Sequence, residues 1–356
     1  MRSRRLPPAE LAGLAPDDLI DAVLLASIRL GTRRLGKGTR LDRALAHELL
    51  GAAESGMLEE APRLGWADEG DLHEDEAAHR LALTVGGAGV DLRPPHLSRV
   101  DLAAKWDGVL HVRTAPLAAV NALDPLEVFT LFHAQCVASG EVVASVKVAP
   151  HLVPGEVVRE GMRLARADGP VIEVRPYRAH EVPAIVAEDI GEPQLDRFVA
   201  GATAKLEALG SRFAGAVQVW ETDAAKSAAR AQVALERLVL KDHRPIVLVT
   251  GVSAGDPLSP FREALLALGG SFVRHGVPAH PGSMIWIARL GRSTLLGLPG
   301  CGMFSLATAA DLVLPRLLTG EVLDATALAE LAHGGLLGRQ MRFRFPAYAR
   351  ELEAPE

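Results

Sequence analysis

A glycine turn that carries a hydroxyl and a carboxylate is the stretch of this sequence best suited to chemistry. It reads Thr250-Gly251-Val252-Ser253-Ala254-Gly255-Asp256 and follows an apolar run at 245–249. Glycines at these positions permit positive φ and let a ligand approach the main chain. Free N–H groups at such a turn bind anions, and one carboxylate combined with substrate oxygens suits Mg²⁺. The alternative is that the Gly-Asp-Pro segment only caps the helix that follows.

A second glycine turn ends a later β-like run. It reads Leu298-Pro299-Gly300-Cys301-Gly302, and the pattern predicts a long apolar helix from Met303 to Leu318 directly after it. The N-terminus of such a helix favours an anion. Ser305 lies in its first turn and could donate to the same ligand. Cys301 could have thiolate character at this place, but the simpler interpretation is a small packing residue.

Strands and helices alternate around the first turn. We expect strands at 182–186, 214–219 and 246–250, and helices at 194–209, 223–240 and 260–268. This alternation predicts right-handed crossovers and a mostly parallel sheet, whose carboxyl edge binds ligands. Two further runs, 284–289 and 293–298, predict a hairpin that adds antiparallel strand to the sheet.

The order of these motifs resembles the molybdopterin-binding domain. That domain is shared by molybdopterin molybdotransferases, molybdopterin adenylyltransferases and stand-alone molybdopterin-binding proteins. The match covers roughly 176–320 and includes the first turn, Arg262-Glu263-Ala264-Leu265, Leu268-Gly269-Gly270, His275-Gly276-Val277, Pro281-Gly282 and Gly297-Leu298-Pro299-Gly300. The resemblance implies an α/β fold with a mostly parallel, three-layer domain at 176–334. An α+β domain at 1–175 precedes it, and a C-terminal tail at 335–356 follows.

The resemblance also implies a ligand and a set of site residues. The ligand is molybdopterin or the molybdenum cofactor, with Mg²⁺, and the reaction resembles insertion of molybdate with cleavage of an adenylyl group. Asp256 takes the catalytic and metal-binding role. The residues expected to bind the cofactor lie in the two turns and at a Pro-Gly corner: Thr250, Gly251, Ser253, Gly255, Pro281, Gly282, Pro299, Gly300, Cys301, Gly302 and Ser305.

Three departures from the family pattern leave other functions open. The first turn has one glycine after Thr250 where the enzymes have two, and 300–302 reads Gly-Cys-Gly where molybdotransferases have Gly-Asn-Pro. The acidic segment expected after the first strand is not recognisable near Glu188-Asp189. One alternative is therefore a non-catalytic carrier that delivers the cofactor to molybdoenzymes or to other proteins of cofactor biosynthesis. Another is a hydrolase of nucleotide pyrophosphates.

The first 175 residues show no catalytic cluster. Gly36-Lys37-Gly38-Thr39 lacks the full spacing of a phosphate-binding loop, and His73 and His79 would point to opposite faces of a helix. We expect a β-hairpin around the glycine-rich segment 31–38 and a helix from Asp42 to about Ala53. A second helix should run to Val85 with Asp71 as its cap. The later pattern predicts strands at 100–104, 109–112, 142–148 and 171–174, and helices at 115–123 and 125–133.

Composition limits the class of protein. The net charge is −6, with no basic tract beyond residues 2–5, so a nucleic-acid partner is not expected. The apolar run 19–30 is too short for a membrane span and contains Asp21 and Arg29. The two cysteines form no metal-ligand spacing and predict free thiols. We expect a cytoplasmic protein without a membrane segment, and the family tends to form dimers or trimers.

Overall fold

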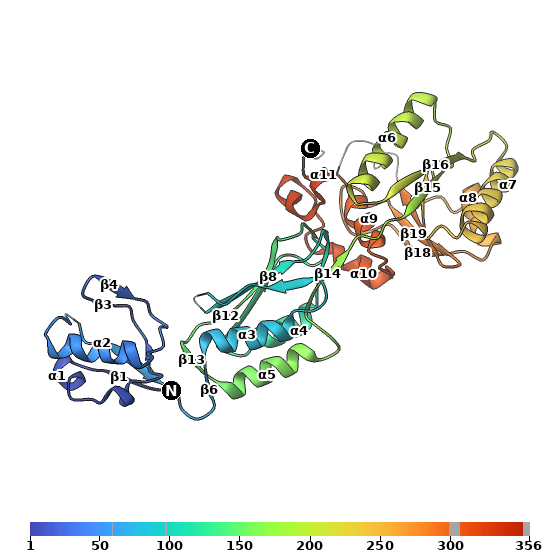
Figure 1. The fold of residues 1–356 in the computed structure, drawn as a ribbon. Coiled ribbons are helices and arrows are strands. Elements are labelled where there is room, and N and C mark those ends of the chain that lie inside the picture. Colours follow the sequence, from blue (N-terminus) through green and yellow to red (C-terminus); the bar gives the residue numbers. More distant parts are fainter. Residues whose placement is uncertain (59, 97, 299–306, 352–356) are drawn as a thin grey trace. The chain divides into compact units, whose positions relative to one another are not determined.

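The computed structural model describes residues 1–58, 60–96, 98–298 and 307–351. The chain divides into two compact units, and Figure 1 labels their helices and strands. The first contains residues 1–106, 111–133 and 139–174, and the second contains 107–110, 134–138 and 175–356. Both units mix helices with strands, in agreement with the predicted α/β class. Within the described ranges, every helix is too short or too polar to cross a lipid bilayer.

Residues 1–66 build a small apolar core of their own. The predicted hairpin is present, but its turn is the two-residue Gly31-Thr32, because Leu30 already pairs with Arg33. Asp42 caps the next helix as expected, and its Oδ1 accepts a hydrogen bond from the Leu45 N–H at 2.8 Å. The elements are β1 (Arg2–Arg5), α1 (Pro8–Leu11), η1 (Pro16–Asp18), β2 (Val23–Leu24), β3 (Ile28–Leu30), β4 (Arg33–Leu35), α2 (Arg43–Glu54) and β5 (Arg63–Trp66).

Residues 67–174 contain a four-stranded antiparallel sheet in the order β10-β12-β8-β7. The prediction of a helix at 125–133 is wrong. Leu126–Thr130 forms strand β10, because buried Leu126 and Val128 alternate with exposed Glu127 and Phe129. The elements are β6 (Asp71–His73), α3 (Glu74–Val85), β7 (Val90–Leu92), β8 (Arg99–Ala104), β9 (Gly108–Val112), α4 (Thr114–Asn121), β10, β11 (Cys136–Val137), β12 (Val142–Val148), β13 (Leu152–Pro154), α5 (Gly155–Arg166) and β14 (Ile172–Pro176).

The cap expected for α3 is also wrong. Asp71 lies in strand β6, where it pairs with Pro154, and its carboxylate is 2.9 Å from the amino terminus of the chain. His73 caps the helix instead, because its Nδ1 accepts a hydrogen bond from the Asp75 N–H at 3.2 Å.

The second unit is built on a six-stranded sheet in the order β16-β15-β17-β20-β19-β18. The first four strands are parallel, and the last two are antiparallel to their neighbours. The predicted hairpin is the β19–β20 pair. The strands are β15 (Glu181–Val186), β16 (Arg212–Gln218), β17 (Ile246–Thr250), β18 (Ser271–His275), β19 (Trp286–Leu290) and β20 (Ser293–Leu298).

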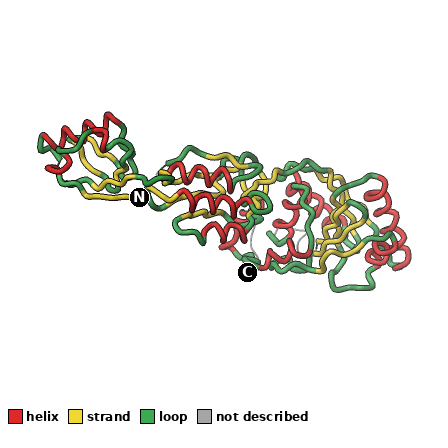
Figure 2. Tube along the Cα trace, turned by 90° about the horizontal axis from the view of Figure 1, so that it is seen from below, coloured by secondary structure: helices red, strands yellow, loops and turns green. Residues whose placement is uncertain are grey.

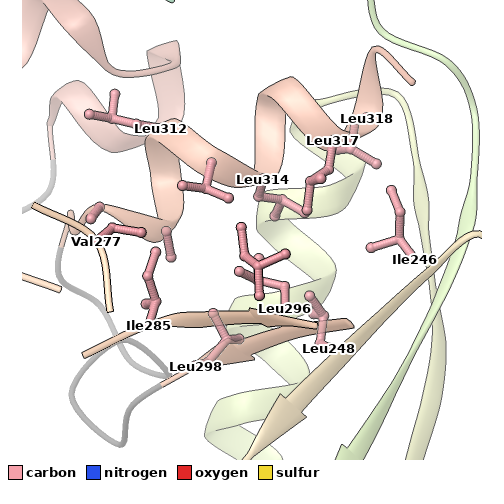
Figure 3. Close-up of a cluster of buried hydrophobic side chains, with 14 of the residues drawn as sticks. Ile246, Leu248, Val277, Ile285, Leu296, Leu298, Leu312, Leu314, Leu317 and Leu318 are labelled. Carbon is pink, nitrogen blue, oxygen red and sulfur yellow. The ribbon is translucent and has the colours of Figure 1, made fainter. Parts of the chain in front are cut away.

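Alternate residues along these strands enter two separate apolar clusters. One cluster contains residues of α6 (Glu192–Ala208) and α9 (Ala310–Leu318), and Figure 3 shows Leu248 and Leu296 on the strands near Leu314 and Leu317 of α9. The other cluster contains residues of α7 (Ala224–Leu235), the π-helical turn η2 (Glu236–Lys241) and α8 (Pro260–Ala267). Helices therefore lie on both sides of the strands (Figure 2).

The helix expected from Met303 begins later, at Ala310. Residues 307–309 are not helical, and the chain enters the helix through Thr308, whose N–H donates to Asp311 Oδ2 at 2.9 Å. In the C-terminal tail, residues 339–344 form a 3₁₀ helix. The last elements are α10 (Ala325–Ala329), η4 (Glu330–Ala332), η5 (Arg339–Arg344) and α11 (Ala347–Arg350).

Candidate functional site

The four parallel strands of the second unit end level with one another. Val186 of β15 pairs with Gln218 of β16 and with Thr250 of β17, and Thr250 pairs with Leu298 of β20. The chain segments that follow these residues therefore leave the sheet from one edge. This is the carboxyl edge at which open α/β sheets bind ligands.

A cavity of about 380 Å³ lies at this edge. Its volume is within the range of small-molecule sites, roughly 300–1,000 Å³. The lining combines the first turn, the segment after β16 and the start of α8, in the residues Ala187, Val219, Trp220, Glu221, Thr222, Ala224, Ser227, Gly251, Asp256, Ser259, Pro260 and Phe261. Two of the predicted site residues, Gly251 and Asp256, therefore share one cavity. The segment 219–222 was not among the predicted site residues.

Glu188 is the acidic residue that the sequence did not reveal. The hydroxyl of Thr250 donates to Glu188 Oε1 at 3.0 Å, and Thr250 has no exposed surface. Gly251 has a φ of +80°, and a Cβ there would lie 2.5 Å from Glu188 Cβ. A carboxylate after the first strand thus lies against the first turn. The signal in the sequence was Glu188-Asp189 two residues beyond β15, but one strand gives no register relative to another.

The predicted ligand groups of the first turn partly bond to one another. The N–H of Gly255 donates to Ser253 Oγ at 3.2 Å, and the N–H of Leu258 donates to Asp256 Oδ1 at 2.9 Å. Asp256 is exposed, and its Oδ2 has no hydrogen-bond partner among the described residues. The N-cap of α8 is Ser259. Asp256 is therefore not the helix cap that the alternative interpretation required.

The segment after β16 is held by side chains from α7. The Glu221 N–H donates to Ser227 Oγ at 2.7 Å, and the Ser227 hydroxyl donates to the Glu221 carbonyl at 3.0 Å. The Glu221 carboxylate pairs with Arg230. Asp223 caps α7, because its Oδ1 accepts hydrogen bonds from the N–H groups of residues 225 and 226. This wall of the cavity therefore has a fixed backbone.

The donor set fits Mg²⁺ better than a metal that needs a protein cage. Among the described residues, no group of three or more His, Cys, Asp or Glu side chains could hold a metal ion. Mg²⁺ keeps several waters and is bound through one or two carboxylates together with substrate phosphates. Glu188 against Gly251 and Asp256 on the cavity wall match that requirement.

The remaining predicted residues divide into two groups. Pro281 and Gly282 do not line the cavity of the described structure; they contact the chain before α9, where the Ala309 N–H donates to the Pro281 carbonyl at 2.8 Å. Gly282 has a φ of +101°, and a Cβ there would lie 2.7 Å from Ala309 N, so this position requires glycine. The others lie outside the described residues: Pro299, Gly300, Cys301, Gly302 and Ser305.

Comparisons with known proteins give matches only among solved structures. No protein-family model matches the sequence, and no curated protein matches it. The molybdopterin biosynthesis enzyme MoaB of Thermus thermophilus aligns with a TM-score of 0.28 and 18% identity, over 40% of this chain and 98% of that protein. The molybdopterin biosynthesis protein MoeA of Pyrococcus horikoshii aligns with a TM-score of 0.28 and 13% identity, over 72% and 80%. MogA aligns with a TM-score of 0.25 and 13% identity, over 45% and 100%.

Proposed function

We propose that this chain binds molybdopterin in an Mg²⁺-dependent manner and acts in molybdenum cofactor biosynthesis as a molybdotransferase-like protein. The motif order in 176–320 supports the ligand class. The observation that carries the proposal is the position of Glu188 against Gly251, at the strand edge where Asp256 lines the cavity. The two helix-covered faces of the sheet support the three-layer arrangement. A cytoplasmic location, a homo-oligomer and the domain limits 1–175, 176–334 and 335–356 belong to the same proposal.

Each residue of the first turn then has a defined task. The buried Thr250 hydroxyl orients the Glu188 carboxylate. Glu188 and Asp256 supply the carboxylate oxygens for Mg²⁺, which neutralises charge on the phosphate groups of the ligand when it is bound. The main chain at Gly251 carries no Cβ, so the loop after β15 and the turn can approach each other closely. These residues position and neutralise charge, and the proposal assigns them no covalent intermediate.

The position of Glu188 favours a transferase over a carrier. The carrier interpretation depended partly on the lack of a recognisable acidic residue after the first strand of this domain. Glu188 occupies that place and is oriented by Thr250. An enzyme needs such preorganised groups because they stabilise charge that develops on the leaving phosphate. A carrier needs only tight binding and slow release of the finished cofactor.

The deciding experiment follows AMP release. Purified protein is incubated with adenylylated molybdopterin, molybdate and Mg²⁺, and AMP is measured over time. We expect catalytic release that depends on Mg²⁺. Tight pterin binding without AMP release would establish the carrier instead. If no pterin species binds, the proposal is wrong, and release of phosphate products from nucleotide pyrophosphates becomes the assay for the hydrolase alternative.

A further inference from the structure

Trp220 presents an aromatic surface to the cavity. It lines the cavity together with Gly251 and Asp256, and 38% of the residue is exposed. Trp286, in the same unit, is only 1% exposed. A tryptophan left partly in water forgoes much of the free energy that burial of its large apolar surface supplies. Its place on the wall of a ligand-sized cavity suggests that the ligand covers it.

The backbone that displays Trp220 is fixed on both sides. On one side, Val219 is buried and its N–H donates to the Val186 carbonyl at 2.9 Å. On the other side, the Ser227 hydroxyl bonds to both main-chain groups of Glu221. An aromatic side chain on a rigid backbone loses little conformational entropy when a ligand binds to it, because only two side-chain torsions remain to be fixed.

The first turn contributes groups of a different chemical character to the same cavity. Gly251 and the Asp256 carboxylate line the cavity and offer groups that suit a phosphate and its Mg²⁺. An aromatic residue and a turn suited to phosphate in the lining of one cavity match a ligand that has a planar ring at one end and a phosphate at the other. Thr222 also lines the cavity and carries a hydroxyl that suits the polar edge of such a ring.

We propose that Trp220 is the stacking platform for the fused heterocyclic ring of the ligand, whose phosphate end lies at the 251–256 turn. This inference rests on the proposed function and deepens it, because it assigns the two ends of a pterin phosphate to two walls of one cavity. Trp220 is then a binding residue that determines specificity for planar rings. Residues 251–256 bind the anionic end whatever the ring is.

The test separates the two ends of the ligand. Dissociation constants are measured by calorimetry for molybdopterin and for inorganic pyrophosphate, both with Mg²⁺. The wild type is compared with Trp220→Ala and Trp220→Phe. Stacking between an aromatic side chain and a base is worth enough that we expect a roughly 10- to 100-fold higher Kd for molybdopterin in Trp220→Ala. The phenylalanine variant should show a smaller loss, and the Kd for pyrophosphate should stay the same in both variants.

Trp106 gives a matched control. It is 37% exposed, nearly the same as Trp220, but it belongs to the first unit and does not line the cavity. We expect molybdopterin to quench tryptophan fluorescence in the wild type and in Trp106→Phe. In Trp220→Phe the quenching should be smaller, because the contribution of Trp220 is absent. Thermal unfolding of each variant checks that the fold is retained.

The outcomes distinguish this inference from the proposed function. If Trp220→Ala binds molybdopterin as tightly as the wild type, the stacking role is wrong while the proposed function stands. An equal loss of molybdopterin and pyrophosphate binding would also overturn it, because the change would then have disturbed the whole cavity. If the wild type binds pyrophosphate with Mg²⁺ but no pterin, the proposed function fails, and this inference fails with it.

Discussion

The hydroxyl of Thr250 donates a 3.0 Å hydrogen bond to the carboxylate of Glu188, and this contact joins the end of β17 to the segment after β15. Thr250 is completely buried, so its hydroxyl bonds to protein groups and not to solvent. The neighbouring Gly251 has no Cβ, which lets the two segments meet. The first turn therefore contacts a second segment that carries an acidic residue, and the proposed site combines these two segments.

Thr250→Val should weaken Mg²⁺-dependent turnover without unfolding the protein. Valine keeps the branched shape but cannot donate, so Glu188 loses the hydrogen bond that orients it. Hydrogen bonds to charged groups contribute about 1.5–3 kcal/mol, and we expect a loss of unfolding free energy of that order. The Mg²⁺ concentration needed for half-maximal AMP release should rise. Titration with Mg²⁺ and denaturant unfolding provide the two measurements.

Thr294→Val is the matched control for that change. Thr294 is a buried threonine on the adjacent strand β20, and its hydroxyl makes no side-chain hydrogen bond among the described residues. It should leave the Mg²⁺ titration unchanged. An equal shift of the titration in both variants would show that β-sheet packing, and not the Thr250–Glu188 contact, controls the site.

Asp256→Asn should abolish Mg²⁺-dependent binding while the fold persists. Asparagine keeps a carbonyl oxygen that can accept from the Leu258 N–H, so the local turn is retained and only the charge is lost. Asp196→Asn removes the same charge from an exposed position on α6 and serves as the control. Calorimetry of pterin binding with and without Mg²⁺ measures the effect. A folded Asp256→Asn protein with unchanged Mg²⁺ dependence would contradict the metal-binding role.

Gly251→Ala should destabilise the protein more than the positive φ of residue 251 alone would. The added Cβ would meet Glu188 Cβ at 2.5 Å, and the φ of +80° is costly for any residue with a Cβ. Gly291→Ala is the comparison, because Gly291 also has a positive φ, +55°, but nothing in the described chain lies within 4 Å of its Cβ position. The comparison variant should lose about 1–2 kcal/mol of unfolding free energy. Gly251→Ala should lose more, and it should also lose pterin binding.

Periodicity predicted most of the second unit because its elements are long and strongly patterned. The strands at 246–250 and 293–298 and the helix at 260–268 appear within one residue of their expected limits. Two of the errors occur at helix starts that are set by a local hydrogen bond between a side chain and the backbone. The hydrogen bond between Thr308 and Asp311 sets the start of α9. Asp71 pairs with Pro154 in a β-ladder, so His73 caps α3 in its place. Such choices depend on contacts between side chain and backbone that composition does not display.

Sequence reasoning predicted only those residues of the candidate site that belong to one continuous segment. Gly251 and Asp256 could be named because they belong to a single turn. Glu188 and Trp220 follow other strands. Glu188 meets the first turn, and Trp220 lines the cavity, because β15, β16 and β17 end in register. Register between parallel strands is set by packing of distant helices and strands, so a single sequence without its fold does not specify it.

The buried ion pair between Lys205 and Asp311 gives the last prediction. Lys205 Nζ lies 2.7 Å from Asp311 Oδ1, and the Tyr348 hydroxyl donates to the same oxygen at 2.9 Å. Burial, followed by the Asp311 charge, raises the pKa of Tyr348, so the phenol stays protonated and continues to donate. The contact therefore holds α6, α9 and the C-terminal tail together.

Lys205→Met should cost about 3–5 kcal/mol of unfolding free energy, because it leaves the buried Asp311 carboxylate without its cation. The double variant Lys205→Met with Asp311→Leu should recover part of that loss, because an apolar pair needs no compensating charge. Arg212→Ala breaks an exposed pair with Glu181 and should cost at most about 1 kcal/mol. Denaturant unfolding of the variants measures all three effects. A double variant less stable than Lys205→Met alone would mean that the Asp311 bonds to Thr308 and Tyr348, and not the ion pair, dominate the stability of this contact.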